Sequence, residues 1–206
     1  TVTITEPESK VKEVVFEEED VTERLTDYVL ASKYNNATMQ ALQSFIPEDA
    51  EQKHAALKVV PFTSSTKYGG IIFNDATYLL GAPEFIMRSE FEKIEDKILP
   101  YTDKGYRALL FAKYDGTERE HGLSGRVEPL ASVIFENPIR QNAKQTFEYF
   151  KKQKVAIKVI SGDNPKTVSE ISEQAGIDGA RHYVDASTLT TDAQVEEALE
   201  TKTVLG

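Results

Sequence analysis

Cysteine is absent from the 206 residues of this chain. Its absence excludes disulfides, thiolate zinc sites and cysteine nucleophiles, and it is compatible with a reducing compartment. No apolar run approaches the roughly 20 residues that a membrane helix needs, and the N-terminus carries no charged-then-apolar signal segment. The sequence therefore predicts a chain that sits in water, with room for one large domain or two small ones.

Positive charge and metal-ligand patterns are also scarce. The formal net charge of −10 argues against a protein that binds nucleic acid through its overall field, although a local basic pocket for a small anion is compatible with it. The histidines, His54, His121 and His182, are scattered without ligand spacing, so the sequence predicts no metal site. It also contains no Gly-x-Ser-x-Gly elbow.

A strand, a tight turn and a helix follow one another between residues 154 and 175. Val155–Ile160 is a nearly continuous apolar run, Ser161–Asp163 forms the turn, and Asn164 and Pro165 open the helix as N-cap and first helical residue. A strand that runs directly into a helix N-terminus points several backbone N–H groups at one place. The pattern therefore predicts a phosphate-binding site at this turn.

The second half of the chain repeats this alternation. Leu130–Phe135 is a buried-type strand, Asn137 and Pro138 open a helix, and Val155–Ile160 is the next strand. Such a βαβ unit predicts two parallel strands joined by a right-handed crossover. Asn137 and Ser161–Asp163 would then meet at one edge of the sheet, where open α/β sheets bind their ligands.

The first half has a different pattern. Short β-prone runs separated by Ser/Thr and Asn-Asp turns predict an antiparallel meander with helices packed on it. The expected strands include 10–16, 59–62, 68–73, 77–80 and 107–114, and the expected helices 21–34, 38–45 and 89–102. Residues 115–129 are rich in glycine and charge and predict a loop or hairpin tip before a domain boundary.

Five segments in this order resemble the cytoplasmic part of P-type cation-transporting ATPases. Pro61–Lys67 is similar to the segment that supplies an adenine-stacking Phe and, five residues later, a Lys. Gly81–Glu84 matches the core of the Lys-Gly-Ala-Pro-Glu motif, and Gly105–Arg107 is similar to the segment with a phosphate-facing Arg. Asn137–Arg140 resembles the Asp-Pro-x-Arg motif and Ser161–Asn164 the Thr-Gly-Asp-Asn motif.

The resemblance implies an α+β nucleotide-binding domain over 1–128 and, over 129–206, part of an α/β, Rossmann-like phosphorylation domain of the haloacid-dehalogenase type. It implies that the parent protein hydrolyses ATP with Mg²⁺ through a phosphoaspartate and moves a cation across the cell membrane. This portion would lie on the cytoplasmic side. Its partners would be nucleotide and the remaining phosphorylation, actuator and transmembrane domains, and the fragment would be a monomer that binds no nucleic acid.

The resemblance also implies residue roles in the first half. Phe62 would stack on adenine, Lys67 and Arg107 would hold phosphate, and Gly81 would line the nucleotide site. The residues alone leave alternatives open, since Phe62 also fits a core position of the meander and Arg107 an exposed strand-edge charge.

Two positions depart from the family pattern at the nucleotide site. Leu80 replaces the Lys before Gly-Ala-Pro-Glu, and Met39 replaces a Glu near the adenine. Leu80 therefore predicts an adenine pocket closed by apolar contact, and weak nucleotide binding driven by stacking.

In the second half, the Ser161 hydroxyl and the Gly162 N–H would contact phosphate, and Asp163 would face the nucleotide or a partner domain. Asn137 and Arg140 would belong to the same nucleotide site; Arg140 is expected in the first turn of its helix, where a cation complements the dipole poorly. Ser161–Asn164 also fits a plain turn and helix cap.

The family's phosphorylated-Asp segment and its magnesium-binding Gly-Asp-Gly segment have no counterpart in the sequence, and we expect them before Thr1 and after Gly206. The fragment alone is therefore expected to be inactive, with no metal ligands of its own. A non-catalytic protein-interaction module is the alternative function. A free-standing phosphatase of the same fold is a third, but it needs an Asp-x-Asp nucleophile that Thr1–Thr5 does not contain.

Overall fold

The computed structural model describes residues 3–6, 8–16, 21–116 and 123–206, and these form two compact units. The first, called here the sheet unit, consists of Ser9–Leu99 and Ala108–Glu136. The second, the C-terminal unit, consists of Thr1–Glu8, Pro100–Arg107 and Asn137–Gly206. No helix among the described residues is long and apolar enough to cross a membrane.

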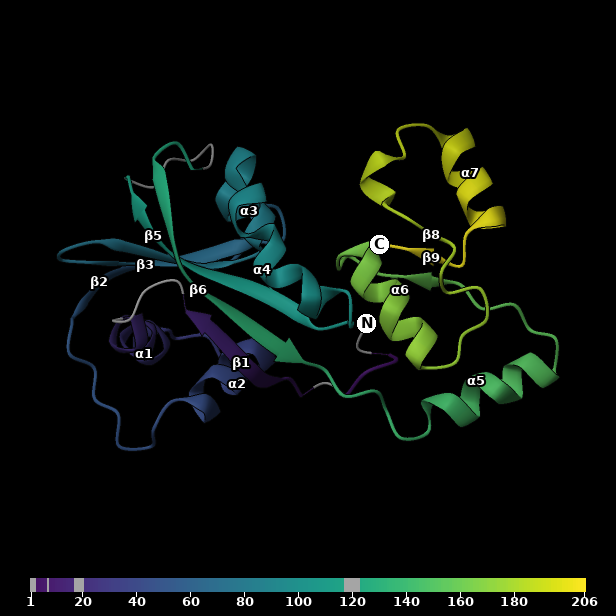
Figure 1. Ribbon diagram of the computed structural model, residues 1–206, viewed down its shortest axis with the longest axis horizontal. Coiled ribbons are helices and arrows are strands. Elements are labelled where there is room, and N and C mark those ends of the chain that lie inside the picture. Colours follow the sequence, from purple (N-terminus) through teal and green to yellow (C-terminus); the bar gives the residue numbers. More distant parts are fainter. Residues whose placement is uncertain (1–2, 7, 17–20, 117–122) are drawn as a thin grey trace. The chain divides into compact units, whose positions relative to one another are not determined.

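The sheet unit is built on a six-stranded sheet with the order β1-β6-β5-β4-β3-β2 (Figure 1). Neighbouring strands run antiparallel in the pairs β1·β6, β2·β3, β3·β4 and β4·β5. The strands are β1 Lys10–Phe16, β2 Ala56–Val60, β3 Tyr68–Phe73, β4 Thr77–Gly81, β5 Arg107–Asp115 and β6 Arg126–Glu136. The antiparallel sheet predicted from the meander pattern is confirmed.

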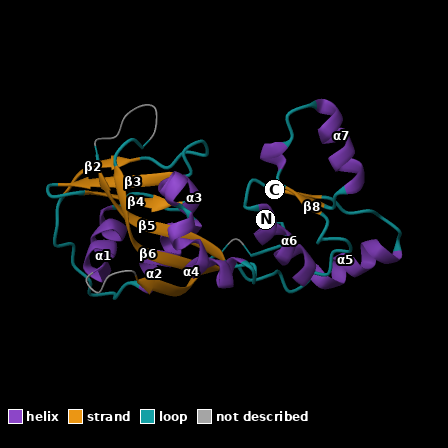
Figure 2. Cartoon of the chain, turned by 45° about the horizontal axis from the view of Figure 1, so that its top comes forward, coloured by secondary structure: helices purple, strands orange, loops and turns teal. Residues whose placement is uncertain are grey.

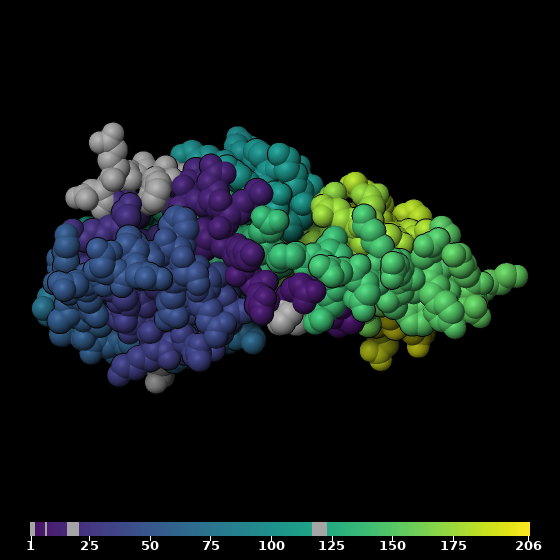
Figure 3. Space-filling model, turned by 90° about the horizontal axis from the view of Figure 1, so that it is seen from below, coloured from purple at the N-terminus to yellow at the C-terminus, as the bar shows by residue number. Residues whose placement is uncertain are grey.

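Helices cover both faces of this sheet. On one face lie α1 (Val21–Ala31) and α2 (Ala37–Phe45), which share a core cluster with Leu80 and Phe111. The opposite face packs against α3 (Pro83–Met87) and α4 (Glu92–Thr102), in a cluster that contains the adjacent residues Leu79 and Leu110; the 3-10 turn η1 (Arg88–Glu90) lies between the two helices in the chain. This alternation follows from the period of two along a strand. In Figure 3 the blue segment that contains α2 and leads to β2 lies on the side of the sheet unit that is turned to the viewer.

The C-terminal unit contains a small parallel sheet. Its order is β7-β9-β8, so the last strand lies in the middle. The strands are β7 Val159–Ile160, β8 Tyr183–Val184 and β9 Val204–Leu205, and the helices are α5 Ala143–Lys152, α6 Pro165–Gln174, the 3-10 turn η2 Ala186–Thr188 and α7 Asp192–Thr201 (Figure 2). Val168 and Ile171 of α6 and Val204 of β9 lie in its core.

The predicted parallel pairing of Leu130–Phe135 with Val155–Ile160 is wrong. Leu130–Phe135 belongs to β6, which lies between β1 and β5 in the antiparallel sheet, and β7 is only Val159–Ile160. A continuous apolar run indicates a strand buried on both faces, and helices on both faces of the sheet unit bury β6 in this way without parallel neighbours. Residues 129–136 therefore lie with the first sheet. The assignment of 1–128 and 129–206 to two functional domains stays a prediction.

Two predicted element boundaries also need correction. The helix expected to open at Asn137 and Pro138 begins only at Ala143. Ile139 bridges to Thr5 and the Arg140 N–H donates to the Ile4 carbonyl at 3.0 Å, so this stretch is held by strand-like pairing. The loop expected over residues 115–129 is shorter, because β5 ends at Asp115 and β6 begins at Arg126; residues 117–122 lie outside the described part.

Candidate functional site

Phe62 lies just after β2, at the start of a turn that ends at Lys67. The Lys67 N–H donates to the Thr63 carbonyl at 2.9 Å, and the Thr66 N–H donates to the Thr63 hydroxyl at 3.0 Å. The Phe62 side chain is 51% exposed, so the alternative that it is a core residue is wrong. The turn therefore presents an aromatic ring to solvent from a hydrogen-bonded support.

The other end of this turn lies against the Gly-Ala-Pro-Glu motif. The Ala82 N–H donates to the Lys67 carbonyl at 2.9 Å. A Cβ on Gly81 would lie 2.4 Å from that carbonyl oxygen and equally close to the Cα of Tyr68, so only glycine fits at this position. Lys67 itself has a φ of 60°, in the left-handed region. The structure thus brings the backbone of Lys67 and Gly81 together.

Gly69 of β3 lies close to the backbone at the start of the same turn. A Cβ on Gly69 would lie 3.3 Å from the backbone nitrogen of Phe62, so the chain at Phe62 runs close over β3. Gly69 pairs with Leu80 across the β3·β4 ladder. Residues 62–67, here called the Phe62 turn, therefore lie in close backbone contact with Gly69 of β3 and Gly81 of β4. Gly69 was missed from the sequence; its only signal was the Gly-Gly pair inside a strand pattern, which indicates a close backbone approach.

Leu80 and Met39 have a different setting. Each is only 5% exposed, and both lie in the core cluster beneath α1 and α2. Their side chains contribute to the hydrophobic core of the sheet unit, where a Lys or Glu would be costly without a partner. The apolar pocket around a base that Leu80 predicts stays a prediction.

Arg107 belongs by contacts to the C-terminal unit, although it is also the first residue of β5. Burial lowers the pKa of its guanidinium, and the Asp163 carboxylate acts in the opposite direction by favouring the charged form. The alternative of a simple exposed strand-edge charge does not hold, because the side chain is partly buried and interacts with Asp163. The structure thus brings Arg107 to the turn before α6.

The turn Ser161–Asn164 is held by its own side chains. The Ser161 hydroxyl donates to the Asp163 carboxylate and accepts the Asp163 N–H, both at 3.2 Å. The Asn164 side chain accepts the N–H groups of Lys166 and Thr167 at 3.0 and 3.3 Å, which confirms Asn164 as the N-cap of α6. These two helix donors are therefore already used. Gly162 has no heavy atom within 4 Å of the position of a Cβ, which leaves open space beside the turn.

Asn137 and Arg140 lie in the segment before α5. Arg140 contacts the N-terminal stretch, through its N–H to Ile4 and through its guanidinium to Glu6 at 3.8 Å. The expectation that Arg140 occupies the first turn of a helix is wrong, since α5 begins three residues later. Because β6 and β7 belong to different sheets, Asn137 and Ser161–Asp163 do not follow neighbouring strands of one sheet.

No family model matches this chain. It is 32% identical over 98% of its length to a probable cation-transporting ATPase, exp7, of Streptococcus pneumoniae, and 31% identical over its whole length to the calcium-transporting ATPase CtpE of Mycobacterium bovis. It also matches the ATP-binding subunit of a potassium-transporting ATPase of Clostridium botulinum, with 24% identity over 61% of the chain.

The chain spans about a quarter of the length of the first two relatives, 26% in each case. These matches cover both compact units, including the Phe62 turn and the turn before α6, and they agree with the five motif-like segments in the sequence. The chain therefore belongs, as a partial segment, to the P-type cation-transporting ATPases.

Proposed function

We propose that this chain is the ATP-handling part of a cation-transporting ATPase. The sheet unit would bind the nucleotide, and the C-terminal unit would form part of a Rossmann-like phosphorylation domain of the haloacid-dehalogenase type. The observation that carries the proposal is the Phe62 turn, where a half-exposed aromatic ring and a lysine lie at the two ends of one short turn. The small parallel sheet with α6 behind it is compatible with the second assignment.

At the Phe62 turn the base would stack on the Phe62 ring, and the Lys67 ammonium would reach the phosphates as a point charge. An aromatic face suits this role because it offers a large contact area at low entropic cost. Gly81 would keep the chain at Lys67 in place by allowing the close approach of β4. Met39 and Leu80 would contribute only the apolar floor, since they are almost fully buried.

At the turn before α6, the Ser161 hydroxyl and the Gly162 N–H would contact the transferred phosphoryl group. Arg107 and Asp163 would fix the charge balance there, and Asn137 and Arg140 stay candidate nucleotide contacts. In the family reaction Mg²⁺ neutralises phosphate charge. Asp163 is the carboxylate of this turn, and it interacts with Ser161 and Arg107.

In the whole protein, this segment would work with the remaining phosphorylation, actuator and transmembrane domains, on the cytoplasmic side of the cell membrane. By itself the chain would be a monomer that binds ATP weakly and does not turn it over. The competing function is a protein-interaction module that uses the same surfaces without nucleotide.

A nucleotide titration followed by amide chemical shifts tests the proposal. With ADP or ATP, we expect localised shifts at Phe62, Lys67, Gly69 and Gly81. Shifts that are absent at millimolar nucleotide, or that lie only outside these residues, would favour the interaction module. Adenosine alone should shift the Phe62 end of the turn, and inorganic phosphate should not.

A further inference from the structure

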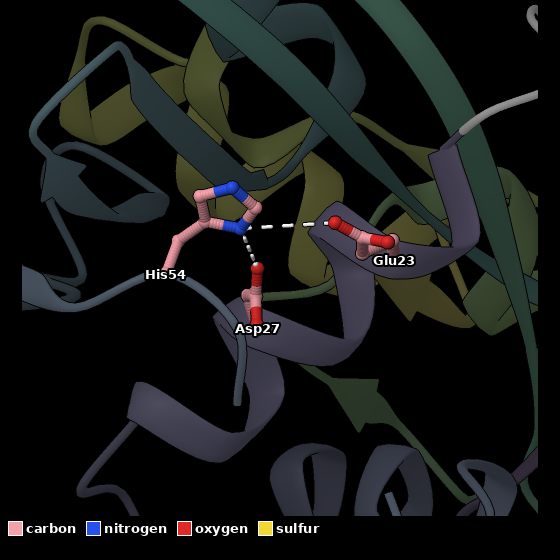
Figure 4. Close-up of side chains that lie close together, drawn as sticks. All are labelled: Glu23, Asp27 and His54. Carbon is pink, nitrogen blue, oxygen red and sulfur yellow. Dashed lines mark hydrogen bonds and ion pairs between the residues drawn. The ribbon is translucent and has the colours of Figure 1, made fainter. Parts of the chain in front are cut away.

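Two carboxylates and an imidazole, those of Glu23, Asp27 and His54, lie close together on the sheet unit. Glu23 and Asp27 are one helical turn apart on α1, and His54 lies in the loop that leads from α2 to β2. The three ligand atoms lie within 4.8 Å of one another. Figure 4 shows both carboxylates directed at the same ring nitrogen, His54 Nδ1, which lies 2.6 Å from Asp27 Oδ2 and 3.8 Å from Glu23 Oε1.

Lys53 contacts both carboxylates. Its backbone N–H donates to Asp27 Oδ1 at 2.7 Å, and its ammonium pairs with Glu23 Oε2 at 2.6 Å. Each carboxylate therefore uses one oxygen for Lys53 and turns the other toward His54. Outer contacts of this kind are what hold the ligands of metal sites in a fixed orientation.

The spacing of the three atoms suits a small divalent cation. Two metal–ligand bonds of about 2.0–2.1 Å that meet at a tetrahedral angle place their ligand atoms about 3.3 Å apart. The two distances from His54 Nδ1 to the carboxylate oxygens, 2.6 and 3.8 Å, lie on either side of this value. A cation at this place would replace the hydrogen bond between His54 and Asp27.

The cluster combines the negative charge of two carboxylates with a side that is open to solvent. Asp27 is fully buried, whereas Glu23 and His54 are partly exposed, so the cluster opens to solvent on one side. His54 also lines a shallow pocket of about 400 Å³ together with Arg24, Lys53, Ala55, Asn74 and Asp75. Water in this pocket can complete the coordination of an ion held by three protein ligands.

We propose that Glu23, Asp27 and His54 form a binding site for a first-row divalent cation, best matched by Zn²⁺. One imidazole and two carboxylates are ligands that zinc accepts, and affinity for such N/O sites is higher for zinc than for manganese or iron. The bound ion would tie the loop before β2 to α1. The expectation of no metal site rested on the spacing of histidines in the sequence, which does not show that His54 folds back onto α1.

The test is a Zn²⁺ titration of the metal-free chain, followed by the imidazole ¹⁵N resonances and by calorimetry. We expect one equivalent to bind, with the His54 ring signals shifting on the Nδ1 side and those of His182 unchanged. His182 is exposed and lies in the C-terminal unit, so it serves as the internal reference. Mn²⁺ should bind more weakly than Zn²⁺.

Variants separate the site from adventitious binding. His54→Ala and Glu23→Gln should each weaken Zn²⁺ binding at least about ten-fold, while the matched His182→Ala should bind as the parent does. Circular dichroism of each variant without metal checks that the fold is kept. The proposal is overturned if His54→Ala binds Zn²⁺ as tightly as the parent, or if the ring signals of His182 or His121 shift in place of those of His54. In that case the cluster is only a hydrogen-bonded clamp.

Discussion

The Ala82 N–H donates to the Lys67 carbonyl at 2.9 Å, and Gly81 lies so close to the same carbonyl that a Cβ would be 2.4 Å from its oxygen. Gly81→Ala should therefore force β4 and the Phe62 turn apart. We expect a loss of about 1–3 kcal/mol in the free energy of unfolding, typical of overpacking, together with weaker nucleotide binding. Urea unfolding and an ADP titration measure the two effects.

Gly162→Ala is the matched control for this change. Gly162 has no heavy atom within 4 Å of its Cβ position, so alanine should alter stability by no more than about 0.5 kcal/mol. Equal losses in the two variants would show that the close approach at Gly81 is not what stabilises the turn.

Phe62→Ala should weaken ADP and ATP binding while leaving the fold intact. The ring is 51% exposed, so its removal costs little core packing, but loss of base stacking should cost about 1–3 kcal/mol, or roughly 5- to 150-fold in affinity. Phe45→Ala removes a phenylalanine of similar exposure, 46%, from the end of α2 and should leave the affinity unchanged. Unchanged affinity in Phe62→Ala would remove the stacking assignment.

Asp27→Ala should destabilise the sheet unit even without metal. Asp27 is fully buried and accepts the Lys53 N–H and the His54 ring N–H, so its removal deletes two hydrogen bonds to a buried carboxylate and leaves both donors without this acceptor. The expected loss is about 1.5–3 kcal/mol in urea unfolding with a chelator present. Glu23→Gln, at a partly exposed position, should cost clearly less; a similar cost in both would mean that burial of Asp27 is not decisive.

Asn164→Ala should remove the cap of α6. The Asn164 side chain accepts two backbone N–H groups, and such a cap contributes about 0.5–2 kcal/mol. Asn142 occupies the corresponding position before α5 but its side chain makes no capping hydrogen bond, so Asn142→Ala should have a smaller effect. Amide hydrogen exchange in the first turns of α5 and α6 measures both, and equal protection losses would contradict the capping argument.

Local patterns predicted most elements because their physical cause is local. The short strands β3 and β4, the apolar face of α1 and the Asn164-Pro165 start of α6 all depend on residues a few positions apart, and each is confirmed. The segments at Phe62 and Gly81 were identified by their resemblance to family motifs. The structure adds a close backbone contact between Lys67 and Gly81, which the order of the motifs did not show.

Pairing between distant segments could not be predicted in the same way. The apolar run of β6 indicates burial on both faces but not which strands lie beside it, so only the tertiary structure decides that β6 pairs with β1 and that β9 lies between β7 and β8. Arg140 also depends on a distant segment: its N–H donates to the Ile4 carbonyl, and the helix begins only at Ala143.

The sequence by itself determined most elements, the family resemblance and the positions of the turns after Phe62 and at Ser161, because each depends on the order and spacing of nearby residues. Only the tertiary structure decided which side chains are buried, as for Met39 and Leu80, and which meet, as for Arg107 with Asp163 and His54 with Asp27. Those outcomes depend on long-range packing within each unit, which the spacing of residues along the chain does not specify.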